Sequence, residues 1–202
     1  SDRSKYQIGV LREDEGRGGS KLMHRIFTQG RKLFIAPPIN HFALTDSAQR
    51  TFLMGGGIGV TPMISMAHEL YSKGKKFELH YSIKSRGSAG YLTELTQAPW
   101  ANNVHLHVSD ENTRAKLDSI LSGYKNNWHV YTCGPDQYMT SVLETAKRQG
   151  FPESAQHLEY FLVPELPDFV NYDFSLKLIK SDREFFVPMN KSAADILNEN
   201  GF

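Results

Sequence analysis

The stretch "TFLMGGGIGVTPMISMAHEL", residues 51–70, decides the fold, because an apolar strand-like run passes through a cluster of glycines into a helix-like sequence. Four glycines lie within the five positions from Gly55 to Gly59, where their conformational freedom costs stability. A backbone without side chains lets a ligand approach closely at the carboxyl end of a strand. We therefore expect a binding loop between a strand and a helix here.

The same alternation continues after this stretch. Short runs rich in β-branched and aromatic residues alternate with amphipathic helical segments. Five strands separated by helices imply right-handed crossovers, and so predict an α/β domain with a doubly wound five-stranded parallel sheet over residues 51–162. The strand-like runs after the first cover 77–83, 103–109, 128–134 and 157–161, and the helical segments cover 62–72, 89–95, 115–121 and 136–149.

Composition excludes several classes of protein. Charged residues make up 22% of the 202 residues and the formal net charge is +1, so neither disorder nor nucleic-acid binding is indicated. No apolar run approaches the roughly 20 residues that span a bilayer, and residues 1–10 lack the basic-then-apolar pattern of a signal peptide. The sequence therefore predicts a cytoplasmic protein with no membrane or nucleic-acid partner.

Cysteine and histidine usage predicts no metal site in these residues. Cys133 is the only cysteine, which excludes an internal disulfide and a cysteine-built cluster. The eight histidines show no metal-ligand spacing. His105 and His107 alternate on one face of a predicted strand, and we interpret them as structural.

The pattern changes on either side of the α/β domain. Residues 6–12 and 32–36 resemble antiparallel strands around a short helix at 20–28. Two strands do not form a stable sheet alone, so residues 1–50 are predicted to end a β domain that begins earlier. A proline-containing linker at 163–172 leads to two alternating strands and a helix, and residues 173–202 are expected to begin a further domain that is cut short.

The glycine loop is a candidate phosphate site. Thr61 is a predicted N-cap, and Pro62 is predicted at the first helical position, where a missing N–H costs nothing. The unpaired amides and the dipole of the helix start suit a pyrophosphate. The spacing is not G-x-G-x-x-G, because Pro62 stands in the place of the third glycine. A tight turn without a ligand remains the alternative.

A second phosphate site is possible near the N-terminus. Gly18 and Gly19 precede Ser20, a predicted N-cap, and the amides there could bind an anion with help from Arg17 and His24. Helix capping alone is an equally good interpretation.

Two further groups lie at the same predicted sheet edge. Cys133, Gly134 and Pro135 end the fourth strand, and Cys133 is either a packed residue or one that faces the reactive end of a dinucleotide. Glu159 and Phe161 end the fifth strand, and the aromatic ring either packs in the core or stacks on a flat cofactor.

These motifs occur in a recognisable order. "GRGGS" at 16–20, "PPINHFAL" at 37–44, "GGIGVTPM" at 56–63, "CGP" at 133–135 and "HLEYF" at 157–161 together resemble the ferredoxin reductase superfamily. Within it the chain most resembles the phthalate dioxygenase reductase-like family, the flavin and iron–sulfur reductases of Rieske oxygenases. The resemblance runs nearly from end to end.

The resemblance implies a three-part organisation. Residues 1–50 would be the C-terminal part of an FMN-binding β-barrel, 51–162 an NAD(H)-binding domain, and 173–202 the start of a [2Fe-2S] ferredoxin domain of the β-grasp type. An Arg-x-Tyr-Ser flavin motif is then expected upstream of Ser1. The loop of cluster cysteines is expected after Phe202, so the cluster belongs only to the full-length chain.

The resemblance also implies roles for particular residues. Gly18, Gly19 and Ser20 would hold the flavin phosphate, and Asn40 and Phe42 would lie beside the barrel. Phe161 would pack on the isoalloxazine ring with Glu159 close by, and these two would act with Cys133 at the reaction centre. The nucleotide pyrophosphate would lie on Gly56, Gly57, Gly59, Thr61 and Pro62, and the nicotinamide near Cys133, Gly134 and Pro135.

The implied function is that of an electron-transfer reductase. A hydride would pass from NADH to FMN, and single electrons would pass through [2Fe-2S] to a terminal oxygenase. Lys84, Ser85 and Arg86 follow the second predicted strand and are chemically compatible with the 2′-phosphate of NADPH, whereas the resemblance favours NADH. The alternatives are an NAD(P)H-flavin reductase with another electron acceptor, and a nucleotide-binding module without enzymatic activity.

Overall fold

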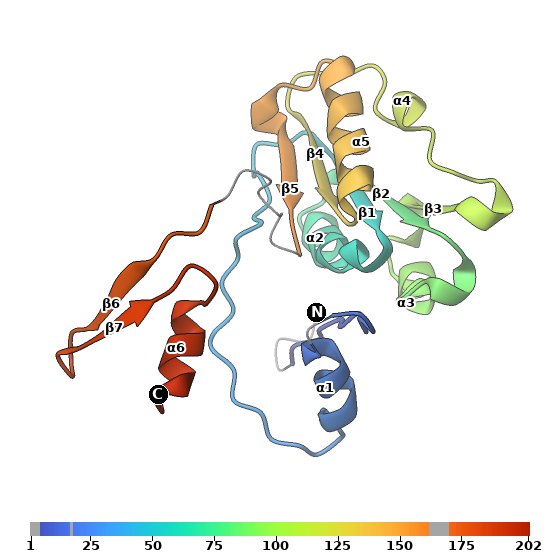
Figure 1. Cartoon of the computed structure of the whole chain (residues 1–202). Helices are drawn as coiled ribbons and strands as arrows, with labels where there is room; N and C mark the ends of the chain where they lie inside the picture. The colour runs from blue at the N-terminus through green and yellow to red at the C-terminus, as the bar shows by residue number, and fades with distance from the viewer. Residues whose placement is uncertain (1–4, 17, 162–169) are drawn as a thin grey trace. The chain divides into compact units, whose positions relative to one another are not determined.

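The computed structural model describes residues 5–16, 18–161 and 170–202 (Figure 1). The chain divides into two compact units, residues 1–162 and 163–202. Arg17 and most of the predicted linker, residues 163–169, lie outside the described residues. Within the described ranges, no helix has the length and apolar character needed to cross a bilayer.

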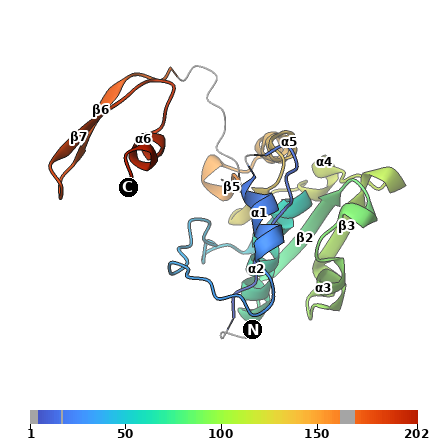
Figure 2. The same cartoon turned by 60° about the horizontal axis from the view of Figure 1, so that its bottom comes forward.

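A five-stranded parallel sheet organises the first unit, which confirms the predicted fold class. The strand order is β3-β2-β1-β4-β5, and β2 and β3 lie side by side in both general views (Figures 1 and 2). β1 is the central strand: β2 and then β3 lie on one side of it, and β4 and then β5 lie on the other side. The strands are β1 Arg50–Gly56, β2 Lys76–Ile83, β3 Val104–Val108, β4 Trp128–Cys133 and β5 Gln156–Glu159.

Helices pack on both faces of this sheet because side chains alternate along each strand. Leu53 of β1 belongs to one core cluster together with residues of α2 and α3. Phe52 and Met54 belong to a second cluster with residues of α5. The α-helices of the unit are α1 Gly19–Ile26, α2 Val60–Ser72, α3 Leu92–Gln97, α4 Leu117–Ile120 and α5 Asp136–Arg148. The short 3-10 helices are η1 Gly57–Gly59, η2 Arg86–Ser88, η3 Ala101–Asn103, η4 Ser109–Glu111 and η5 Glu153–Ala155.

Helix α2 begins earlier than predicted. Its N-cap is Gly59, which makes no side-chain cap, so the predicted N-cap role of Thr61 is wrong. The Thr61 hydroxyl instead donates to the carbonyl of Ile58 at 3.1 Å. Pro62 lies within the first turn, where an amide would have no helical partner. The helix is held by a buried face of Val60, Met63, Ile64, Met66, Ala67 and Leu70.

The predicted strands at 6–12 and 32–36 do not form in the described part of the chain. A strand needs a second strand to pair with, and no strand pairs with either segment among the described residues. Leu33, Phe34 and Ile35 are accordingly exposed. Phe42, by contrast, packs against the ring of Tyr131 with 5.5 Å between the centroids, so the chain that follows residues 32–36 is anchored to β4.

The second unit is an antiparallel hairpin of β6 Phe174–Leu178 and β7 Arg183–Val187, followed by α6 Ala193–Glu199, as the sequence predicts. Asp182 turns the hairpin with a φ of 50°. Ser192 caps α6, and its hydroxyl accepts a hydrogen bond from the amide of Asp195. The unit has the hairpin and helix with which the resemblance expects a ferredoxin domain to begin.

Candidate functional site

The site is built at the point where the strand order reverses. The chain leaves β1 toward β2 on one side and returns to pair β4 on the other, so the loops after β1 and β4 meet at the carboxyl edge. Open α/β sheets bind ligands at such a switch point. The glycine loop and the Cys133-Gly134-Pro135 turn are therefore adjacent, as their places in the sequence predict.

Three glycines allow these two loops to touch. A Cβ on Gly59 would collide with the carbonyl group of Cys133. A Cβ on Gly134, whose φ is +151°, would lie 2.9 Å from the Cα of Gly56. A Cβ on Gly56 would lie 2.9 Å from the ring of Tyr138. These glycines are thus required for packing between the loops, a role that the sequence interpretation assigned to ligand approach.

Gly57 is different from its neighbours. Its φ is +55°, and a Cβ there would meet nothing within 4 Å. It lies in η1, directly before the N-terminus of α2, where the positive end of the helix dipole favours an anion. The open space, the helix start and the absence of an acidic residue in the first turn of α2 fit a pyrophosphate.

Cys133 is a buried thiol and not an exposed nucleophile. It is 1% exposed and belongs to the core cluster under α2. Burial, and secondarily the nearby carboxylate of Glu159, raise its pKa to about 12. The thiol therefore stays protonated at neutral pH, and what Cys133 presents to the glycine loop is its backbone carbonyl.

A pocket next to this edge contains residues that sequence reasoning missed. Tyr138 of α5 packs over Gly56, and the hydroxyl of Ser82 lies 3.5 Å from the Tyr138 oxygen. Burial raises the pKa of Tyr138 to about 12, so it remains a neutral phenol. The pocket has a volume of ≈ 290 Å³ and is lined by Ser82, His107, Ser109, Arg114, Ala115, Leu117, Tyr138 and Ser141. These residues come from the ends of β2 and β3, the segment after β3, and helices α4 and α5, so only the carboxyl ends of the two strands could have indicated them from the sequence.

In the loop after β2, Arg86 forms an ion pair with a carboxylate. Arg86 forms two hydrogen bonds with the carboxylate of Glu111, at 2.7 and 3.1 Å. This contact raises the pKa of Arg86 and lowers that of Glu111. Ser85 and Ser88 form a reciprocal capping box around η2, and Lys84 is exposed. The loop is therefore ordered by its own contacts and by η4.

The two predicted residues at the end of β5 differ in placement. Glu159 pairs with Cys133 in the sheet register and is the last residue of the strand. Phe161 lies beyond the strand and is 51% exposed. Its ring is therefore not part of the core, which leaves it available for stacking.

The N-terminal candidate site is open and basic. Gly18, with a φ of +93°, is the N-cap of α1, and a Cβ on Gly18 or Gly19 would meet nothing within 4 Å. Ser20 is not the predicted N-cap: it lies inside α1, and its hydroxyl accepts a hydrogen bond from the amide of Glu13 at 3.0 Å. The adjoining pocket of ≈ 830 Å³ is lined by Arg12, Gly18, Gly19, Lys21, Leu22, His24 and Arg25. These residues fit a phosphate.

The N-terminal segment also reaches the nucleotide edge. The amide of Gln7 donates to the carboxylate of Glu94, and a Cβ on Gly9 would lie 2.9 Å from the methyl of Thr61. The segment before α1 therefore lies against α2 and α3. Candidate flavin-binding and nucleotide-binding parts are in contact through these residues.

Comparison with known proteins gives a consistent assignment. No family model matches the sequence. Vanillate O-demethylase oxidoreductase of Acinetobacter baylyi is 32% identical over 203 residues, covering 100% of this chain and 64% of the relative. Carnitine monooxygenase reductase subunit of Escherichia coli is 36% identical over 199 residues, covering 98% of this chain and 61% of the relative. The chain thus spans less than two thirds of these relatives.

A solved structure supports the same assignment. Phthalate dioxygenase reductase, described as a modular structure for electron transfer from pyridine nucleotides to [2Fe-2S], superposes with a TM-score of 0.75 at 30% identity. The match covers 95% of this chain and 60% of that protein. It includes the parallel sheet whose switch point carries the two touching loops. These matches support placing the chain in the phthalate dioxygenase reductase-like family.

Proposed function

We propose that this chain is the FMN- and NADH-binding part of a reductase component that supplies electrons to a Rieske-type oxygenase. The observation that carries the proposal is the pair of touching loops at the switch point, with Gly57 open beside the start of α2. The names of the relatives, which are reductases and oxidoreductases of oxygenase systems, support the same activity.

The glycine loop would bind the pyrophosphate of the nucleotide. Gly57 provides the open backbone, and the first turn of α2, which contains Thr61 and Pro62, provides the positive end of the helix dipole, although Pro62 itself has no N–H to donate. Gly56, Gly59 and Gly134 act as positioning residues, since they set the distance between the loops. The nicotinamide would then lie beside Cys133, Gly134 and Pro135, where the buried thiol adds no charge.

The flavin would be held by the N-terminal part. The amides at Gly18, Gly19 and Ser20, with Lys21 nearby and Arg12 in an ion pair with Asp14, suit the FMN phosphate. The exposed ring of Phe161 is available to pack on the isoalloxazine, with Glu159 close by. When bound, the nicotinamide supplies a hydride and the flavin accepts it and releases single electrons; the protein supplies orientation and proximity.

The charges at the loop after β2 support NADH over NADPH. A 2′-phosphate would need a cation, and of the two cations in this loop Arg86 is already paired with Glu111, whereas Lys84 is exposed. Asp110 lies beside Glu111, and its amide donates to the carbonyl of Lys84, which places a second acidic residue next to this loop. Repulsion between these carboxylates and a 2′-phosphate favours the free ribose of NADH.

The remaining parts of the proposal concern the whole protein. The single cysteine of this chain is insufficient for a [2Fe-2S] cluster, so its four thiolate ligands are assigned to the full-length protein. The terminal oxygenase is the proposed partner, in line with the relatives' names. A cytoplasmic location is also part of the proposal.

An anaerobic titration with NADH tests the proposal. The full-length protein loaded with FMN should lose its flavin absorbance in the near-ultraviolet and blue as NADH is added. If the bands are unchanged although the protein is folded and holds FMN, the proposal fails and a nucleotide-binding module without activity is favoured. If the bands bleach but the oxygenase receives no electrons, the alternative of another electron acceptor is favoured.

A further inference from the structure

The strand order fixes the direction in which a nucleotide would lie across the sheet edge, and this step rests on the proposed function. The pyrophosphate is assigned to the loop after β1, and the nicotinamide to the turn after β4. The adenosine would then extend the other way, over the ends of β2 and β3, because these strands lie on the opposite side of β1. The pocket of ≈ 290 Å³ lies at those ends.

This pocket has the composition of a nucleoside site. It adjoins the glycine loop, because the ring of Tyr138 lines the pocket and also packs over Gly56. The rest of its wall combines apolar side chains with hydroxyl groups, including Ala115, Leu117, Ser82, Ser109 and Ser141. Sites for small ligands typically have apolar walls with a few polar groups. The pocket is therefore suited to an adenine ring and its ribose.

His107 of β3 is part of the pocket wall and is supported from the sheet. It is opposite Ser82 of β2 in the strand register, and both residues line the pocket. Nε2 of His107 lies 3.0 Å from Nδ1 of His80, and the two rings are 9° from parallel with 5.3 Å between centroids. These values describe two imidazoles that meet edge to edge, so their hydrogen bond sets the orientation of the His107 ring.

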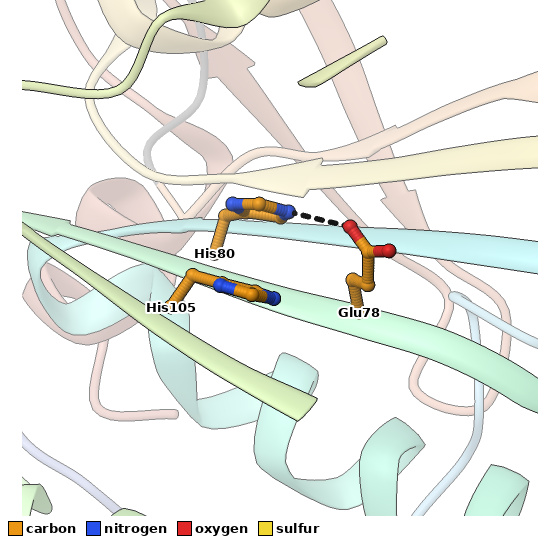
Figure 3. A group of neighbouring side chains, drawn as sticks. All are labelled: Glu78, His80 and His105. Carbon is orange, nitrogen blue, oxygen red and sulfur yellow. Dashed lines mark hydrogen bonds and ion pairs between the residues drawn. The ribbon is translucent and has the colours of Figure 1, made fainter. Parts of the chain in front are cut away.

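His80 is itself fixed by its neighbours. It is 4% exposed, and its Nε2 is 3.2 Å from Oε2 of Glu78. The ring of His105 lies against it with 4.7 Å between centroids, and Arg50 binds Oε1 of Glu78. Figure 3 shows Glu78, His80 and His105, which together with His107 form the cluster around His80. Because both ring nitrogens of His80 have a partner, the ring cannot rotate without losing a buried hydrogen bond.

We propose that His80 is a positioning residue for nucleotide binding: it holds His107 in the wall of the pocket that receives the adenosine of NADH. His107 contacts the adenosine, and His80, which lies outside the pocket lining, acts only through His107. A buried and hydrogen-bonded support keeps a binding residue in one conformation, so less conformational entropy is lost when the ligand binds.

Anaerobic stopped-flow reduction of the full-length, FMN-loaded protein tests this role with two matched variants. In His80→Asn a polar atom stays next to Cγ, where Nδ1 of histidine stands, so the contact with His107 is kept. In His80→Gln the amide extends toward the position of Nε2, so that contact is lost. His80→Gln should raise the half-saturating NADH concentration roughly three- to tenfold, and His80→Asn should remain near the parent value.

A shorter substrate separates this role from a general structural one. Reduced nicotinamide mononucleotide has no adenosine, so its half-saturating concentration should be the same in the parent protein and in His80→Gln. The maximal rate of flavin reduction by NADH should also be unchanged, because the hydride leaves the other end of the nucleotide.

Two further variants complete this experiment. His107→Ala should raise the half-saturating NADH concentration at least as much as His80→Gln, and the combined variant should show no additional rise, because His80 acts through His107. His129→Gln is the matched control: it removes a hydrogen bond of the same kind, from Nδ1 to Nε2 of His157, but between β4 and β5. It should leave the ratio of the two half-saturating concentrations unchanged.

A measurement on the unsubstituted protein does not depend on how the variants fold. Adding adenosine 5′-monophosphate should shift the imidazole NMR signals of His107 and His80, and leave that of the exposed His41 in place.

Three results would overturn the inference while leaving the proposed function intact. They are an unshifted His107 signal, parent-like NADH dependence in folded His80→Gln, and an equal weakening of NADH and of the mononucleotide in that variant. If NADH does not reduce the flavin of the parent protein at all, the proposed function fails, and this inference fails with it.

Discussion

At the scale of single residues, the glycines of the switch-point loops have distinct roles. Gly59, Gly56 and Gly134 keep two backbones in contact, and Gly57 alone has open space beside it. Side-chain additions at these positions should therefore have different consequences, on folding in the first group and on ligand binding at Gly57.

Gly59→Ala should destabilise the first unit. Its new methyl would collide with the carbonyl of Cys133, so the two loops would have to separate. We expect a loss of about 1–3 kcal/mol in the free energy of unfolding, as overpacking usually costs. Urea denaturation measures it, with Gly90→Ala as control because a Cβ there meets nothing within 4 Å. Equal stability of the two variants would contradict the packing role.

Cys133 should be unreactive in the folded protein. Its pKa is raised to about 12, mainly by burial, so at pH 8 only about one thiol in 10⁴ is ionised. In this chain, which has no other cysteine, Ellman's reagent should label the native protein very slowly and the guanidinium-unfolded protein completely. Rapid labelling under native conditions would show that the thiol faces the open edge instead.

At the scale of secondary-structure elements, a histidine pair joins β4 to β5. Nδ1 of His129 lies 2.9 Å from Nε2 of His157, whose ring also stacks on Tyr131 with 4.2 Å between centroids. Burial, with the nearby His129 as a second cause, lowers the pKa of His157 to about 4. Folding therefore favours the uncharged ring.

Acid should weaken this connection. Because the folded-state pKa of His157 is below its ordinary value, its contribution is present above about pH 6.5 and is lost as the pH falls toward 4. Between pH 7 and pH 5 the unfolding free energy of the parent protein should fall more than that of His157→Gln, by on the order of 1 kcal/mol. Urea denaturation at the two pH values measures this, and identical pH dependence would contradict it.

The ion pair between η2 and η4 should influence nucleotide choice. Glu111→Gln removes the partner of Arg86 and should free the guanidinium for a 2′-phosphate. We expect the ratio of kcat/KM for NADPH to that for NADH to rise roughly three- to tenfold. Asp118→Asn is the control, because Asp118 pairs with Arg148 on α4 and α5 instead. An unchanged ratio in Glu111→Gln would show that the ion pair between Arg86 and Glu111 does not influence the choice between NADH and NADPH.

The elements themselves were largely predictable, and the exceptions have physical causes. The runs at 77–83 and 128–134 carry enough apolar and β-branched residues to identify buried strands. The strands expected at 6–12 and 32–36 were wrong because pairing depends on a neighbour, which local sequence does not reveal. Thr61 and Ser20 look like N-caps, but each lies within its helix and bonds to a nearby backbone group.

The candidate site was predictable only in part. The order of strands and loops indicated which segments would share an edge, including Gly57 and Cys133. It did not indicate that Gly59 packs on the Cys133 carbonyl, or that Tyr138 covers Gly56, because such contacts depend on how closely the loops approach. The cluster around His80 was missed because its members are brought together by strand register and not by spacing along the chain.

At the scale of the whole molecule, the chain consists of a sheet-based unit and a smaller hairpin-and-helix unit. The first unit contains both candidate anion sites, at the starts of α1 and α2. The relatives are longer than this chain, and the proposed electron path continues into parts that correspond to their additional length. The central claim is thus that the loop at Gly57 binds the nucleotide that reduces the flavin.

Anaerobic stopped-flow reduction of the full-length, FMN-loaded protein tests this claim most directly. The NADH concentration that gives half-maximal flavin reduction should rise at least about tenfold in Gly57→Leu, whose side chain would fill the open space. Gly57→Asn is the control, because asparagine tolerates the positive φ with a smaller side chain. If Gly57→Leu folds, retains FMN and shows the NADH dependence of the parent protein, the nucleotide does not bind at this loop.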